Sequence, residues 1–265
     1  MKHVVLAVGL GIAGVLVFVQ PAWAAASVAP PIPVGVAPNE VTFSPDGTVA
    51  YSANSGSNDI SVIDVASGTT VGLPIPVDAQ PVSIAFVPNG SAAYVASNGG
   101  TVSVIDTASA LVTDTIAIAG ASFIEITPDG ATAYVASFGT NTVVPLDVVT
   151  GVAGTPIPVG SGPTGLAISP DGSRLYVANT WDGTVSAIDI ATNTVITQIA
   201  VGPRPFQLTV SPDNSEVWVA VGDINALAVI DAATLETVAT IAVGQNPRSV
   251  TISPDGTTAL AESYF

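Results

Sequence analysis

The sequence predicts an all-β fold built from one unit that is repeated along the chain. A turn related to Ser-Pro-Asp-Gly recurs with its prolines 43, 40, 42, 42 and 42 residues apart, at Pro45, Pro88, Pro128, Pro170, Pro212 and Pro254. Each copy has short runs rich in β-branched residues between turn residues, which is typical of a four-stranded antiparallel sheet. One such sheet cannot bury both apolar faces, whereas radially arranged sheets can, so we expect a β-propeller.

The copy between Gly162 and Gly202 shows the expected elements most clearly. Its strands are expected at residues 164–169, 174–178, 184–190 and 194–201. Pro170-Asp171-Gly172 turns the first strand into the second, and Ala191-Thr192-Asn193 turns the third into the fourth. These turn residues suit tight connections because Asp and Asn bond their own backbone and Gly adopts positive φ.

The two ends of the repeat region indicate how the propeller closes. Residues 32–35 repeat the end of a fourth strand seen at 157–160, five complete units follow, and the sixth supplies strands at 248–253 and 258–262. We therefore expect a domain over 32–265 with about six blades. Residues 32–35 are expected to close an incomplete last blade. The alternative is a truncated relative of a seven-bladed parent.

Several motifs of the repeat resemble a known family. The copy carries Tyr176-Val177-Ala178-Asn179, then Gly183-Thr184-Val185-Ser186 and Ile188-Asp189, after its Ser-Pro-Asp-Gly turn. Together these look like the YVTN-type β-propeller repeat of secreted and surface-layer proteins. The resemblance implies the fold, whereas propellers of this kind serve as binding scaffolds, lactonases or lyases, so it does not assign an activity.

The first residues resemble a secretory leader. Lys2 and His3 precede an apolar run of 16 residues, Val4 to Val19, and Ala22-Trp23-Ala24 fits a cleavage site. We expect a signal peptide over 1–24, a linker over 25–31 and a secreted or extracytoplasmic protein, in the periplasm or at the cell surface. The chain has no cysteine, so its stability depends on packing.

The composition of the chain excludes several classes of partner and several kinds of catalytic or metal site. The chain has 20 acidic and 4 basic side chains and a net charge of −16. Nucleic acid is therefore a poor partner, and no membrane span is expected after leader cleavage. Without Lys2 and His3 the chain has no histidine, lysine or cysteine, which excludes histidine triads, Schiff-base lysines and His/Cys zinc sites. We expect a monomer.

Two recurring residue sets are assigned to structure. One aromatic residue stands six positions after most turn prolines and is expected to pack between blades: Tyr51, Tyr94, Tyr134, Tyr176 and Trp218. Ten aspartates occupy turns, where a carboxylate accepts bonds from nearby amides and hydroxyls. They are Asp46, Asp129, Asp171, Asp213 and Asp255 after the prolines, and Asp64, Asp106, Asp147, Asp189 and Asp231 after the third strands.

Residues that depart from the repeat on the loop face are the functional candidates, because the fold does not require them. Glu125 interrupts a row of small residues on the first strands, and Glu40 lies at the entrance of another first strand. If the chain is an enzyme, they are the expected catalytic carboxylates. Any metal, such as Ca²⁺, is expected at Glu40, Glu125 and Asn225, although the leading expectation is no cofactor.

A second set of candidates suggests binding. Exposed aromatic residues grouped with arginine and aspartate are typical of a binding spot. The expected residues are Phe138, Trp181, Asp182, Arg204, Phe206 and Arg248. The leading function is a secreted binding scaffold for a protein or carbohydrate partner, and the alternative is a hydrolase of the propeller-lactonase kind.

Overall fold

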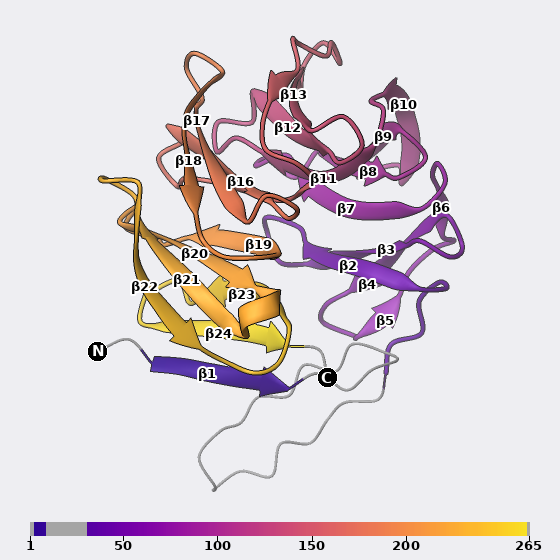
Figure 1. The fold of residues 1–265 in the computed structure, drawn as a ribbon. Helices are drawn as coiled ribbons and strands as arrows, with labels where there is room; N and C mark the ends of the chain where they lie inside the picture. Colours follow the sequence, from indigo (N-terminus) through magenta and orange to yellow (C-terminus); the bar gives the residue numbers. More distant parts are fainter. Residues whose placement is uncertain (1–2, 9–30, 264–265) are drawn as a thin grey trace, which may run out of the picture. The chain divides into compact units, whose positions relative to one another are not determined.

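The computed structural model describes residues 3–8 and 31–263, and its regular secondary structure is almost entirely β-strand (Figure 1). Contacts divide the chain into a unit Pro30–Pro156 and a unit that joins Met1–Ala29 to Ile157–Phe265. The expected signal peptide, apart from residues 3–8, and the expected linker, apart from residue 31, lie outside the described residues. No helix among the described residues is long and apolar enough to cross a membrane.

The unit Pro30–Pro156 contains three antiparallel sheets. The first is formed by β2 (Pro38–Phe43), β3 (Val49–Asn54), β4 (Asp59–Asp64), β5 (Thr69–Thr70) and β6 (Ile75–Pro76). The second is formed by β7 (Pro81–Phe86), β8 (Ala92–Ser97), β9 (Thr101–Asp106) and β10 (Leu111–Ala117). The third contains β11 (Ala121–Ile126), β12 (Thr132–Ser137) and β13 (Thr142–Asp147).

The other unit begins with β14 (Ile157–Pro158) and also contains three sheets. One has β15 (Pro163–Ile168), β16 (Arg174–Asn179), β17 (Thr184–Asp189) and β18 (Thr194–Ala200). The next has β19 (Pro205–Val210), β20 (Glu216–Val221), β21 (Ala226–Asp231) and β22 (Glu236–Ala242), with a short 3-10 helix at Gly222–Ile224. The last has β23 (Pro247–Ile252), β24 (Thr258–Ser263) and β1 (His3–Val8).

Two expected strands differ in the structure. Residues 32–35 form no strand, so the strand expected there was wrong, whereas the place of this segment beside the last blade stays a prediction. Pro31 and Pro33 lack the amide hydrogens that a strand pairing needs. The segment instead bonds within its own unit, where Gly35 N donates to Ser61 Oγ at 3.2 Å. The strand beside β24 is β1, and the two are parallel.

The fourth strand of the first sheet is also interrupted. It consists of the two short strands β5 and β6, which both pair with β4. Gly72 between them has φ +71°, a left-handed conformation that a continuous strand does not contain. Pro74 and Pro76 remove further amide donors, so the pairing with β4 is discontinuous.

The turn aspartates act as the sequence predicts. Asp171 Oδ1 accepts bonds from the hydroxyl of Ser169 at 2.6 Å and from the amide and hydroxyl of Ser173 at 3.0 and 2.8 Å. Asp189 Oδ1 accepts from the amide and hydroxyl of Thr192, both at 2.8 Å. These bonds stabilise the ionised form and lower the pKa of both aspartates.

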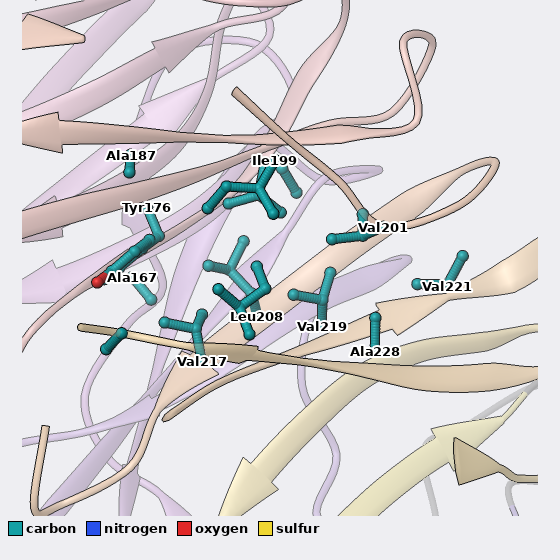
Figure 2. Close-up of a cluster of buried hydrophobic side chains, with 14 residues drawn as sticks. Ala167, Tyr176, Ala187, Ile199, Val201, Leu208, Val217, Val219, Val221 and Ala228 are labelled. Atoms are coloured by element: carbon teal, nitrogen blue, oxygen red, sulfur yellow. The ribbon is translucent and has the colours of Figure 1, made fainter. Parts of the chain in front are cut away.

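The core lies between adjacent sheets, as the aromatic column predicts. Tyr176 is 1% exposed and Trp218 is 3% exposed. Figure 2 shows one of these cores, where Tyr176 and Ile199 of one sheet meet Leu208 and Val219 of the next. Tight packing at this register fixes how the first strands of neighbouring sheets meet.

Candidate functional site

The first strands of the sheets in the unit Pro30–Pro156 bring two carboxylic acids near one another. β7 packs against β2 and also against β11 (Figure 1). Glu40 lies on β2, Glu125 lies on β11, and both side chains are half-buried. β2, β7 and β11 belong to three different sheets and form no backbone ladder with one another. The amide and carbonyl groups on their facing edges therefore need side chains as hydrogen-bond partners.

Glu40 supplies one of those partners. Its Oε2 accepts the amide hydrogen of Ile84 at 2.8 Å. Thr42, on the same strand, donates its hydroxyl to the carbonyl oxygen of Ile84 at 3.2 Å. On the other side of β7, the buried Ser83 Oγ accepts the amide hydrogen of Ile124 at 3.3 Å. Side chains therefore join three successive first strands where no backbone ladder does.

Burial raises the pKa of both acids. The pKa of Glu40 rises from 4.5 to about 7 because desolvation outweighs its hydrogen bonds from Ile84 and Ser83. The pKa of Glu125 rises from 4.5 to about 8, first through desolvation and then through the negative charge of Glu40. Carboxyl groups that titrate near neutral pH suit general acid and base chemistry.

Of the expected metal ligands, Glu40 and Glu125 lie in the unit Pro30–Pro156, and a shared site with Asn225 stays a prediction. Asn225 belongs to the other unit, and its side-chain oxygen accepts the amide hydrogen of Asn246 at 2.8 Å. Asn225 has φ +53° and ends the short helix, so its side chain also has a turn role. Among residues 3–8 and 31–263, no group of three or more His, Cys, Asp or Glu side chains is arranged to hold a metal.

The second candidate site lies in the unit that contains Ile157–Phe265 and is built on a recurring loop position. The residue directly before the first strand of each sheet is left-handed in all six copies, with φ between +49° and +72°. The six residues are Ala37, Gln80, Gly120, Gly162, Arg204 and Asn246. Glycine and asparagine tolerate this conformation best, so Arg204 is held there at a cost in backbone energy.

Arg204, Phe206 and Arg248 form a compact stack, which we call the arginine stack. The guanidinium carbon of Arg248 lies 3.9 Å from the centre of the Phe206 ring, and that of Arg204 lies 5.5 Å from it. Phe206 and Arg248 occupy equivalent positions, 42 residues apart, on the packed strands β19 and β23. Two cations within this range of one ring are held by cation–π attraction.

The Arg204 guanidinium has only part of its hydrogen-bonding capacity satisfied. Its Nη1 lies 3.4 Å from Asp223 Oδ1, a long ion pair whose side chains are 41% and 44% exposed. Its Nε is buried without a hydrogen-bond partner. A buried donor without an acceptor costs free energy, so an additional oxygen atom here would be stabilising.

Trp181 lies in a loop that adjoins the arginine stack. Its side chain is 61% exposed, and a Cβ added to Gly162 would meet its ring at 2.2 Å, so the indole lies over that glycine. The preceding residue, Thr180, donates its hydroxyl to Pro205 O at 2.7 Å, between Arg204 and Phe206 in the chain. Asp182 Oδ2 accepts the amide hydrogen of Ser161 at 2.6 Å and thereby holds the loop.

The structure thus joins some of the predicted binding residues. Arg204, Phe206 and Arg248 are in contact, and Trp181 and Asp182 lie in the adjoining loop. Phe138 belongs to the other unit and is 38% exposed, so its expected grouping with Trp181 stays a prediction. Sequence reasoning did not pair Asp223 with Arg204; the repeat spacing alone does not show which loop side chains meet.

Comparisons with known proteins support the fold. Residues 161–262 match the model of the YNCE-like beta-propeller family, and residues 83–200 match the model described as "Lactonase, 7-bladed beta-propeller". This chain has the β-propeller fold. Each match covers less than half of the chain, and the resemblance to YVTN-type repeats stays a prediction. The search of the curated proteins gave no match.

A solved structure agrees with this fold. A chain of Kuenenia stuttgartiensis hydrazine synthase is similar with a TM-score of 0.67 and 21% sequence identity, over 92% of this chain and 96% of that chain. At this identity the similarity concerns the fold, not the activity. The functional assignment of the propeller therefore has to come from its own side chains.

Proposed function

We propose that this β-propeller is a secreted binding scaffold that takes a protein or carbohydrate partner on the loops around the arginine stack. The observation that carries the proposal is the pair of arginines on Phe206 in a chain with only four basic residues. The remaining arginine of the repeat region, Arg174, donates to Ala232 O and has a structural role. Half the basic side chains of the chain are thus placed on one ring.

The left-handed backbone of Arg204 recurs at Ala37 and Gln80, so the surroundings of its side chain, rather than its φ, support a role beyond folding. Equivalent positions carry Gly162 and Asn246, which adopt this conformation more readily. The position of Arg204 near the Phe206 ring and the loop of the exposed Trp181 suggests that its side chain is needed for binding.

This conformation gives a sharp test. Arg204→Asn should leave the free energy of unfolding within about 1 kcal/mol, because relief of the backbone offsets the loss of an exposed ion pair. The same change should weaken binding about tenfold or more if Arg204 is a hot spot.

The partner is sought with the purified chain on a glycan array and in cross-linking to candidate extracellular proteins. Any hit is then titrated against the parent, Arg204→Asn and Trp181→Ala. Arg174→Gln removes the same charge from the other end of β16 and is the matched control. Unchanged affinity of both loop variants for every hit would contradict the proposal.

A hydrolase of the propeller-lactonase kind is the second candidate, favoured by the raised pKa of Glu40 and Glu125. The match to the lactonase model includes Ser83 and Glu125, whereas Glu40 lies outside it. The test measures hydrolysis of simple aliphatic lactones, with and without added Ca²⁺. Hydrolysis is monitored through the base consumed by the acid that it releases. Loss of a measured activity in Glu125→Gln, with Arg204→Asn active, would support the hydrolase; no activity under either condition would contradict it.

A further inference from the structure

The loops around the arginine stack have a chemical character that narrows the partner. Their large exposed apolar side chains, among the described residues, are Trp181 and Ile224. A stable protein interface covers about 800 Å² on each partner and centres on a larger apolar patch. Two such side chains among carboxylates, amides and hydroxyls fit a small polar ligand better than a protein surface.

Charge narrows the ligand further. Arg204 and Arg248 carry two positive charges, and Asp223 and Asp182 in the same loops carry two negative charges, so the site suits a ligand that combines one anionic group with hydroxyl donors. The whole chain carries −16 and repels dense polyanions at long range. A carboxylate fits this balance, and the planar guanidinium group matches a planar carboxylate in paired hydrogen bonds.

The exposed indole of Trp181 supplies a surface for a ring. The face of an aromatic ring is electron-rich and attracts the slightly positive C–H groups of a neighbouring group. The bond from Thr180 to Pro205 keeps the tryptophan loop beside the start of β19, and the carboxylates of Asp182 and Asp223 are acceptors suited to sugar hydroxyls. An aromatic face, cations and acceptors in adjoining loops are the groups that an acidic sugar needs.

We propose that the arginine stack and Trp181 bind a uronic acid unit of an extracellular glycan, with the arginines on its carboxylate and the indole on its ring. This inference rests on the proposed binding function and names its ligand class. The buried Nε of Arg204 gains an acceptor when the guanidinium shifts toward the carboxylate. No bond is made or broken, so the site is a recognition site.

The experiment uses a galactose oligomer that carries a single galacturonate unit, the methyl ester of that oligomer and the neutral galactose oligomer as probes, measured by calorimetry and tryptophan fluorescence with the purified chain. The ester keeps the sugar ring and removes the charge. The acid should bind at least about tenfold more tightly than the ester to the parent. Arg248→Gln should lose that preference, Trp181→Ala should weaken both ligands, and Arg174→Gln should behave as the parent.

The outcomes separate the inference from the proposed function. Equal affinity for acid and ester, or a preference that survives Arg248→Gln, overturns carboxylate recognition. If no saccharide binds while a protein hit depends on Arg204 and Trp181, the uronate inference fails and the binding scaffold stands. If no hit of any kind depends on these two side chains, both fail.

Discussion

Replacing Glu125 by glutamine should stabilise the protein at alkaline pH and leave it unchanged at acidic pH. The pKa of Glu125 is raised from 4.5 to about 8 by burial and by Glu40. Between these values the folded chain keeps a proton that the unfolded chain has released. The free energy of unfolding therefore falls as the pH rises through this window and is level above it. Glutamine is neutral at every pH, so Glu125→Gln removes this fall in the free energy of unfolding.

The size of the effect follows from the shift. From 4.5 to about 8, at about 1.4 kcal/mol per pH unit, the maximum is about 5 kcal/mol. Glu125 is half-buried and keeps some contact with solvent, which reduces the effect, so a gain of about 2 to 5 kcal/mol at pH 9 is expected for Glu125→Gln. Glu40, with its pKa raised to about 7, still gives the variant a smaller fall between pH 4.5 and 7.

The assay is urea unfolding, monitored by circular dichroism, from pH 2 to pH 9. Glu236→Gln, which removes an exposed carboxylate from β22, is the control for charge. A Glu125→Gln curve that runs parallel to the parent curve across the whole range would refute the reasoning. Below about pH 4 all variants should lose stability together, because the turn aspartates have lowered pKa values, reaching about 2 for Asp255.

Two further predictions concern the loops and first strands of the unit that contains Ile157–Phe265. Gly165→Ala should destabilise the fold by about 2 kcal/mol or more in urea unfolding, because the new Cβ lies 2.4 Å from Phe206 O. Gly139→Ala, with no atom within 4 Å, is its control. Thr180→Val should cost about 1 to 3 kcal/mol in the same assay, because its buried hydroxyl no longer satisfies Pro205 O. If the free energy of unfolding of Gly165→Ala or Thr180→Val equals that of the parent, the contact concerned does not contribute to stability as argued.

Much of the fold is predictable because it repeats. Strands β16 and β17 begin at the residues that the pattern indicates, and the tyrosine column is buried as expected. The strand expected at residues 32–35 was inferred from their match to residues 157–160, but neither segment pairs well as a strand. Both segments are rich in proline, and the second forms only the two-residue strand β14. Similarity between copies predicts similar structure, whereas ladder pairing also requires amide donors.

The candidate sites were only partly predictable, because their geometry depends on contacts between copies. The sequence identifies Arg204, Phe206 and Arg248 as departures from the repeat. That the two arginines share one ring follows from the packing of β19 against β23. The partner of Arg204, Asp223, lies in the short helix after β20, at the position that Trp181 occupies in the preceding copy, so the residue type there changes between copies.

The hydrogen bonds between the first strands distinguish Glu40 from Glu125. Where two first strands pack together, a backbone amide at an equivalent position of each copy needs an acceptor or must be shielded from water. Glu40 accepts it from Ile84, and Ser83 accepts it from Ile124. Glu40 is thus explained by the fold, since a glutamine or serine oxygen performs the same task.

Glu125 has no such explanation. No hydrogen bond to its carboxyl group is found among the described residues, and its partner in register on β12 is Tyr134. The charged form of a half-buried carboxyl group near a second acid is costly, so Glu125 keeps its proton up to about pH 8. Glu40→Gln should therefore retain the tie to Ile84 and lower the pKa of Glu125 by removing a negative charge, an effect that titration of Glu125 by NMR would measure.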